Sequence, residues 1–462
     1  MRSRLIYLMS LALMVVVSCA KEDQEKITPS DGGDESEGTI TLNLKSHYVD
    51  KIDYDGLTKC VVSDYNAVVD VELDQTPAFQ DAITAISDAG GGILEVPAGI
   101  YHISGVYMRS NVHILVDSDV VFKPYMIDPT DEAESVIMFN FNYEKKVTSE
   151  SNIVQNCSIR GVNGTYTVDY SDYGYPFSMR FALARVVRNF LIADVKVLDN
   201  YNKHCAITFS PADAAGADKW SISRPTDGEI RNISIDKANS GYGLCQLHGA
   251  NRLYFENISG IGGVTLRLET GADVDYAGVF DIHARNIYNE SGKAAAMTSP
   301  HTVCNGTVKL ETVRSKSSSF AFFANSGFLD KTVDDGDNTA TNGVFASDSE
   351  VVNIYAEYGT TAQVAEKDVY LVPESLYDLF TMSNQQSWID SNNLSFIGPA
   401  LSAVYDKTES SYQVKYQNVS SDGFPFEPYM YLEEAADRDN NKWDYRNLVP
   451  CYIDYIASLE AN

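Results

Sequence analysis

Short runs of β-branched residues follow Asn or Gly along most of the chain and return at intervals of about two dozen residues, a period typical of solenoids. Within each run apolar and polar positions alternate, as in a half-buried strand. No helical pattern of about 10–15 residues separates the runs, which excludes a doubly wound α/β sheet, and the hairpin turns of a sandwich are missing. We therefore predict an all-β fold, a right-handed parallel β-helix whose rungs are three to five residues long. The predicted rungs are Asn189–Ile192, Asn232–Ile235, Arg252–Phe255, Phe280–His283, Val308–Glu311 and Val352–Tyr355.

One amphipathic helix is predicted over residues 76–88. Thr76 is a good N-cap residue, Pro77 is a good first helical residue, and the glycines at 90–92 end the segment. An open solenoid end would expose core residues and unpaired strand edges. We expect this helix to close the amino-terminal end of the β-helix.

The amino terminus has the features of an export signal. Arg2 and Arg4 precede an apolar stretch, Leu5–Val17, that is too short to span a membrane. It ends in Val17-Ser18-Cys19-Ala20, which looks like a bacterial lipobox with Cys19 as the lipidated residue; the alternative is an ordinary signal peptide that contains a Cys. The acidic segment that follows resembles the surface-export signals of Bacteroidetes lipoproteins. We expect an outer-membrane lipoprotein, at the cell surface or in the periplasm.

The predicted organisation combines these segments. Residues 39–75 are expected to lie along the solenoid as strands, and the repeat fades after about residue 360. The predicted parts are a signal peptide at 1–18, an acidic tether at 19–38 after Cys19, a β-helix catalytic domain at 39–364 and a carboxy-terminal cap at 365–462.

Net charge and cysteine spacing limit the kinds of ligand and metal that the protein is expected to bind. A net charge of −29 argues against nucleic-acid or general membrane-surface binding, but it leaves room for an anionic ligand held in a local basic groove. The six cysteines after Cys19 show no zinc-binding spacing, and we expect at most one disulfide among them. We also expect a monomer.

Three adjoining stretches carry the candidate chemistry. Gln246, Glu269 and His301 are 23 and 32 residues apart, close to one turn of the coil each, which predicts that they lie side by side on one outer face. If Leu266 and Leu268 point inward, Arg267 and Glu269 point outward together. The spacing fits an acid site, and it fits a solvated Arg–Glu pair beside a structural His equally well.

These residues resemble a known family. Leu266-Arg267-Leu268-Glu269-Thr270, followed by Ala294–Met297, Pro300-His301 and Asn305-Gly306, is similar to the iota-carrageenases of glycoside hydrolase family 82. These are β-helical enzymes that cleave the β-1,4 bonds of a sulfated red-algal galactan with inversion. The resemblance implies that Glu269 is the general acid, that Gln246 holds an ion or water near the cleaved bond, and that His301 helps catalysis. It also implies a chloride near Gln246 and structural Ca²⁺ or Na⁺ elsewhere, with no cofactor needed for the chemistry.

The chain departs from the family at the base. The family has Asp two residues after the acid, whereas this chain has Gly271. An inverting hydrolase needs its carboxyl groups about 6.5–9.5 Å apart. Asp273 would lie about 13 Å from Glu269 on a straight strand, so it serves as the base only if Gly271 starts a turn. Asp273 is the first candidate, and Asp275 or a more distant carboxylate stays open.

Further residues are candidates for substrate binding. Arg267, Arg180 and Lys203 are candidates for contacts with sulfates, because guanidinium and ammonium groups bind oxyanions. His248 lies two residues after Gln246 on the same predicted face. Trp220, Tyr173 and Tyr175 fit either sugar stacking or loop packing. A general acid must be protonated near neutral pH, so we expect the pKa of Glu269 to be raised.

The sequence thus predicts a lipid-anchored, endo-acting glycoside hydrolase on iota-carrageenan. One alternative is a β-helical polysaccharide lyase acting on an acidic polysaccharide, with a Lys, Arg or His base and usually Ca²⁺. Another is a non-catalytic surface glycan-binding protein, which the missing Asp at position 271 favours.

Overall fold

The computed structural model describes residues 38–142, 146–147, 153–214, 223–270, 278–301, 304–329, 341–383, 395–408, 411–426, 431–433 and 448–460. The predicted signal peptide and Cys19 lie outside these residues. No helix in the described part of the chain is long and apolar enough to cross a membrane. The six described cysteines are all free thiols.

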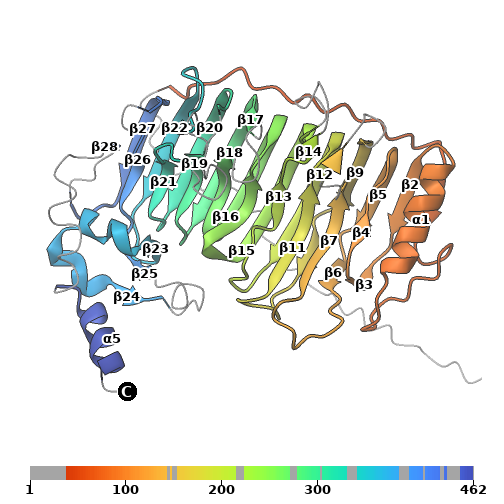
Figure 1. The fold of residues 1–462 in the computed structure, drawn as a ribbon, viewed down its shortest axis with the longest axis horizontal. Helices are drawn as coiled ribbons and strands as arrows, with labels where there is room; N and C mark the ends of the chain where they lie inside the picture. Colours follow the sequence, from red (N-terminus) through yellow and green to blue (C-terminus); the bar gives the residue numbers. More distant parts are fainter. Residues whose placement is uncertain are drawn as a thin grey trace, which may run out of the picture. The chain divides into compact units, whose positions relative to one another are not determined.

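The chain from residue 38 forms the predicted parallel β-helix, whose coils stack strand upon strand (Figure 1). Each full coil contributes to three sheets. Sheet 1 contains β4 (Val106–Tyr107), β7 (Ser135–Phe141), β11 (Ser178–Ala184), β13 (Ile207–Phe209), the later parts of β15 (Thr226–Leu247) and β16 (Ala250–Thr270), β19 (Ala294–Pro300), β21 (Phe320–Ala324), β26 (Ser402–Asp406) and β28 (Tyr431–Glu433).

The other two sheets are formed largely by the same long strands before and after a bend. Sheet 2 contains β1 (Thr58–Cys60), β2 (Gly92–Val96), β5 (Val112–Asp117), β9 (Val154–Val162), β17 (Val279–Phe280) and the first parts of β12 (Val187–Leu198), β15, β16, β18 (Ile282–Glu290), β20 (Val308–Lys316), β22 (Glu350–Glu357) and β27 (Lys415–Asp422). Sheet 3 contains β3 (Gly99–Ile103), β6 (Val120–Pro124), β10 (Tyr166–Asp169), the middle parts of β15 and β16, and the later parts of the other long strands. Outside the three sheets, β8 (Lys146–Val147) pairs with β14 (Asp213–Ala214).

Many strands are longer than the three to five residues predicted, and β15 runs for 22 residues. The chain bends from sheet 2 to sheet 3 at single residues with left-handed φ, such as Asn232 and Asn257, without leaving the hydrogen-bonded ladder. Asn tolerates this conformation better than most residues. Its side chain also bonds the next coil: Asn257 Nδ2 donates to Asn232 Oδ1 at 3.1 Å.

The predicted helix is confirmed as α1 (Thr76–Asp88), which lies at one end of the stack (Figure 1). Its buried face packs on the first coils, with Phe79 in ring contact with Tyr101 and Phe122. The N-cap residue of this helix was predicted wrongly, because Gln75 and not Thr76 is at that position. The Thr76 hydroxyl instead accepts a hydrogen bond from Ser104 N at 2.8 Å.

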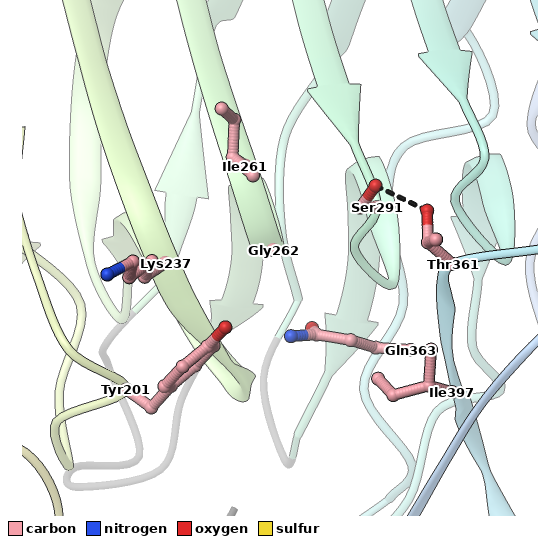
Figure 2. A pocket seen from close by; sticks show the side chains of 8 residues that line it. All are labelled: Tyr201, Lys237, Ile261, Gly262, Ser291, Thr361, Gln363 and Ile397. Atoms are coloured by element: carbon pink, nitrogen blue, oxygen red, sulfur yellow. Dashed lines mark hydrogen bonds between the residues drawn. The ribbon is translucent and has the colours of Figure 1, made fainter. Parts of the chain in front are cut away.

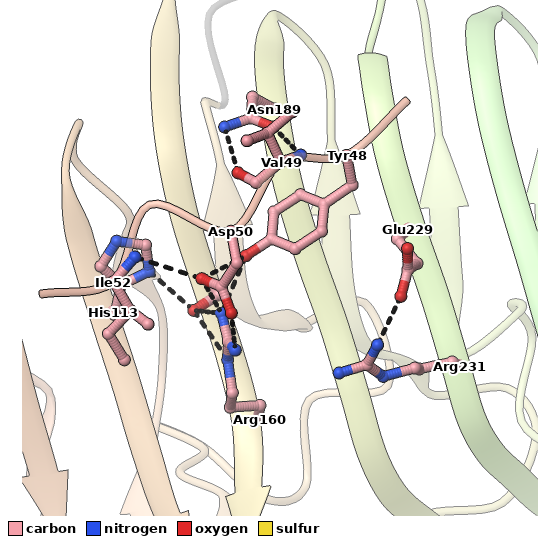
Figure 3. A network of polar contacts seen from close by, with 10 residues as sticks. Tyr48, Val49, Asp50, Ile52, His113, Arg160, Asn189, Glu229 and Arg231 are labelled. Carbon is pink, nitrogen blue, oxygen red and sulfur yellow. Dashed lines mark hydrogen bonds and ion pairs between the residues drawn. The ribbon is translucent and has the colours of Figure 1, made fainter. Parts of the chain in front are cut away.

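Residues 38–50 form an extended strap along sheet 2, and β1 is the only strand among residues 39–75, so the prediction of several strands there was wrong. The strap is held by side chains of the solenoid. Near one end Asn353 exchanges hydrogen bonds with both backbone groups of Ile40, and near the other Arg160 forms a bidentate pair with Asp50 (Figure 3).

The solenoid extends past residue 364, where the sequence placed the start of the cap, because β26, β27 and β28 continue the sheets. The cap elements are β23 (Ala362–Ala365), η2 (Glu366–Leu371), η3 (Glu374–Leu379), β24 (Thr381–Met382), β25 (Ser395–Gly398) and α5 (Pro450–Glu460). Apolar cap residues such as Val364 and Phe380 pack on Met297, Phe323 and Tyr405 of sheet 1.

Candidate active site

The candidate catalytic residues lie on the outer face of sheet 1, at the ends of β15 and β16. Leu266 and Leu268 are buried in the core, so Arg267 and Glu269 point outward together, as predicted. The register differs by two residues from the spacing in the sequence: Gln246 pairs with Arg267, and Glu269 pairs with Ser299. Gln246 therefore reaches Glu269 diagonally across the two strands.

Glu269 is bound from three sides. Gln246 Nε2 donates to Oε2 at 2.7 Å, and Arg267 Nη2 donates to Oε1 at 2.7 Å. His301 Nε2 lies 3.8 Å from the same Oε1. Arg267 is itself fixed by a second hydrogen bond, from Nη1 to the carbonyl oxygen of Gly241. The structure thus brings three predicted residues, Gln246, Arg267 and His301, around the carboxylate of the fourth, Glu269.

The expected raised pKa of Glu269 is wrong for this arrangement. Burial acts to raise the pKa, but the charge of Arg267 and the contacts from His301 and Arg267 outweigh it and hold the pKa well below its usual range. The carboxylate is therefore ionised near neutral pH. To act as a general acid, Glu269 must gain a proton after a ligand has changed these contacts.

A second group of predicted residues gathers on the preceding coils of the same face. Arg180 Nε donates to Thr208 Oγ1 at 3.2 Å, and Thr208 pairs in register with Gln246. The pKa of His204 falls to about 3, through burial and then through the positive charges of Arg180, Lys203 and His248. Arg180, Lys203 and His248 therefore lie near His204, which is itself neutral, on the face that carries Gln246.

Sequence reasoning missed two lysines on the other side of Arg267. Lys293 and Lys407 both lie over the Phe323 ring, at 5.4 and 5.5 Å from its centre, and Lys407 Nζ is 3.4 Å from Asp368 Oδ1. Burial and the nearby charge of Lys367, with smaller effects from Arg267 and Lys407, lower the pKa of Lys293 to about 8. Lys293 directly precedes the apolar run Ala294–Met297, and this lone charge beside buried residues was the available signal.

Some predicted residues lie outside the described part of the chain. Asp273, Asp275 and Gly271 fall within residues 271–277, and Trp220 falls within 215–222, so the choice of base stays a prediction. Tyr173 is described and packs its ring on Phe177, with the ring centres 5.4 Å apart, as its loop-packing alternative requires.

The chloride that the resemblance implies near Gln246 stays a prediction. Gln246 Nε2 and Arg267 Nη2 donate to the Glu269 carboxylate, whereas Arg267 Nε is buried and makes no hydrogen bond within the described residues. For metals, the described residues contain no group of three or more His, Cys, Asp or Glu side chains that could hold an ion.

Comparison with known proteins agrees with this geometry. The chain is 29% identical over 437 residues to an iota-carrageenase of Alteromonas macleodii, matching 82% of this chain and 86% of the relative. It is 32% identical over 334 residues to an iota-carrageenase of Zobellia galactanivorans, matching 70% of this chain but 64% of that longer relative. The chain is a homologue of the iota-carrageenases. No family model matches it.

Solved structures of iota-carrageenases share the fold over most of both chains. A 1,3-α-1,4-β-D-galactose-4-sulfate-3,6-anhydro-D-galactose-2-sulfate 4 galactohydrolase superposes with a TM-score of 0.74 at 27% identity, covering 86% of this chain and 95% of that one. An iota-carrageenase complexed to iota-carrageenan fragments gives 0.74 at 25% identity with the same coverage. The parallel β-helix predicted from the sequence is confirmed by these structures.

Proposed function

We propose that this protein hydrolyses the β-1,4 bonds of iota-carrageenan, with Glu269 as the general acid. The observation that carries the proposal is the outward Glu269 carboxylate, bound by Gln246 and Arg267 on a face crowded with basic side chains. Such a face suits a sulfated chain, although the whole protein has a net charge of −29. The named activity of the relatives supports the same substrate.

The proposed reaction follows the inverting scheme. Glu269 donates a proton to the glycosidic oxygen while a base takes a proton from the water that attacks the anomeric carbon, and the bond between this carbon and the glycosidic oxygen breaks. Asp273 is the proposed base, with Asp275 as the alternative. A sulfate that draws the Arg267 guanidinium away from Glu269 would remove the main stabilisation of the carboxylate and so raise its pKa.

The reaction type can be tested on purified protein with iota-carrageenan. Hydrolysis releases new reducing ends without ultraviolet absorbance, and proton NMR of the first products should show the inverted anomer. Products that absorb in the ultraviolet would establish a lyase. Tight binding without new reducing ends after long incubation would establish a glycan-binding protein. Because basic side chains provide the attraction, we expect affinity to fall as salt rises.

We further propose that the protein is anchored in the outer membrane through lipid on Cys19 and acts as a monomer. The Val17-Ser18-Cys19-Ala20 sequence supports the anchor. Labelled fatty acid should be incorporated into the full chain and lost in Cys19→Ser. Protease treatment of intact cells would then separate a surface location from a periplasmic one.

A further inference from the structure

A hollow of about 250 Å³ lies outside the candidate active site, where sheet 3 turns into sheet 1 beneath the cap. Figure 2 shows Tyr201 and Lys237 on one side of it, and Gln363 and Ile397 of the cap on the other. Its volume is slightly below the range of about 300–1,000 Å³ typical of ligand pockets, so it suits one sugar residue rather than several.

The wall formed by the cap is firmly attached. Gln363 Oε1 accepts a hydrogen bond from Gly263 N at 2.7 Å, and its Nε2 donates to Ala238 O at 3.1 Å. Ser291 Oγ and Thr361 Oγ1 lie 2.6 Å apart across the same seam. The hollow is therefore preformed, which reduces the ordering that a ligand would have to impose.

The residues at this corner are unusual for their backbone conformation. Tyr201, Lys237 and Ser291 have φ of 61°, 56° and 51°, a left-handed region that favours Gly and Asn. At the corner between sheets 2 and 3 the same conformation is taken by Asp194, Asn232, Asn257, Asn286, Thr312, Asn353 and Asn418. A Tyr and a Lys thus occupy positions where Asn would be less strained, and both line the hollow.

The chemistry of the lining indicates the ligand. Tyr201 offers an aromatic ring and Ile261, 41% exposed, an apolar surface of the kind on which sugar rings pack. Lys237 is exposed at the rim and makes no ion pair within the described ranges, and Figure 2 shows its ammonium group turned outward from the hollow. An aromatic ring and an apolar surface fit a sugar ring in the hollow, and the cation at the rim fits a sulfate that projects outward from that sugar.

We propose that this hollow is a second binding site, which holds one sulfated sugar residue of the polysaccharide outside the catalytic face. The proposal rests on the proposed function for its choice of polymer. A chain bound at the corner would be retained near the active site between cleavage events, and affinity for long chains would rise through a second, tethered contact.

The test measures binding of iota-carrageenan polymer by calorimetry in an inactive Glu269→Gln background. Lys237→Ala should weaken binding about threefold to tenfold and flatten its salt dependence, while Lys196→Ala, which removes an exposed lysine from sheet 3, should leave both unchanged. Tyr201→Asn should weaken binding similarly without lowering the melting temperature, because Asn tolerates the left-handed backbone.

The outcomes separate the two proposals. If the wild type cleaves iota-carrageenan but Lys237→Ala and Tyr201→Asn bind like the Glu269→Gln parent, the second site is refuted and the proposed function stands. If the wild type does not cleave but both variants bind more weakly, the second site stands on a glycan-binding protein. If the wild type is folded but neither cleaves nor binds iota-carrageenan, both proposals are refuted.

Discussion

Sheets 1 and 2 carry nearly the same charged motif on their outer faces and use it differently. On sheet 1 Arg267 pairs with Glu269 at 2.7 Å, and on sheet 2 Arg231 pairs with Glu229 at 2.6 Å. In both, the second carboxylate oxygen is also bound. Glu229 Oε2 accepts a hydrogen bond from Ser46 Oγ of the strap at 2.7 Å, whereas Glu269 Oε2 accepts one from Gln246 of the neighbouring strand.

The difference lies in what covers each pair. The strap crosses sheet 2 and uses its charged side chains as attachment points (Figure 3). On sheet 1 the carboxylate is surrounded by side chains of its own face and by further cations. An outward Arg–Glu pair two residues apart is therefore not by itself a sign of catalysis, and the neighbours decide its role.

The largest effect should come from Glu269→Gln. If Glu269 is the general acid, turnover of iota-carrageenan should fall about 10²- to 10⁴-fold, because Gln keeps the size and hydrogen bonds but cannot supply the proton. Reducing-end assays measure this, and calorimetry should show substrate binding largely kept. The matched variant Glu229→Gln on sheet 2 should stay within about twofold of the wild type. Near-full activity of Glu269→Gln would mean that the site is assigned wrongly.

Arg267→Gln should have the next largest effect. It leaves a buried carboxylate without its partner, which typically costs about 3–5 kcal/mol. The low pKa of Glu269 stabilises the fold above the carboxyl's unfolded pKa, and this contribution is lost as pH falls towards the folded pKa. The cost should therefore be largest near pH 7 and shrink on acidification, as read from urea unfolding midpoints.

The control is Arg231→Gln, whose side chain is 36% exposed against 16% for Arg267, while its partner Glu229 is only 11% exposed. Because water reaches the arginine end of this pair, we expect a smaller loss of stability than in Arg267→Gln. Equal losses in the two variants would remove the distinction between the two faces. Arg267→Gln should also move the alkaline limb of the kcat/KM profile to higher pH, because the pKa of Glu269 rises when Arg267 is removed.

Asp199, at the turn from sheet 3 to sheet 1, is a buried carboxyl whose pKa is raised, whereas that of Glu269 is lowered. Its burial raises the pKa to about 7, despite hydrogen bonds to Oδ1 from Asn200 and Asn202. The folded state thus favours the neutral form, and stability should decrease as pH rises from about 4 to about 7. Asp199→Asn removes this titration, so the melting temperature of the variant relative to wild type should rise over that range, by an amount equivalent to at most about 4 kcal/mol. A pH-independent difference would contradict the assignment.

The β-helix was predictable because the alternation of apolar residues and the length of the coil are both set by burial. Strand lengths were not, because Asn232 and similar residues look like breaks but only bend a continuous ladder. The strap was predicted as strands, although it is irregular. Residues 38–50 have no period of their own, and they are fixed by side chains more than a hundred positions away, such as Arg160 and Asn353.

The site residues were predicted on the right face of the sheet, but the predicted strand register was off by two residues. In-register residues are 21 apart from Gln246 to Arg267 and 30 apart from Glu269 to Ser299, two fewer than the spacings read from the sequence. The pairing of β15 with β16 shifts register between Ile235 and Gly243, which sequence spacing cannot show. An error of two keeps a side chain on the same face of a strand, whereas an error of one would have reversed it.

The smallest predicted effect tests whether the strap is purely structural. Ser46→Ala removes the hydrogen bond to Glu229 and the one that Ser46 Oγ accepts from Tyr48 N, and should cost about 1–2 kcal/mol in thermal unfolding. Thr41→Ala, at an exposed strap position, is the matched control and should change nothing. Both variants should keep wild-type kcat and KM, because the strap lies on sheet 2 and the candidate acid on sheet 1. If Ser46→Ala lowered activity severalfold while Thr41→Ala did not, the two faces would be coupled, and the strap would belong to the catalytic apparatus after all.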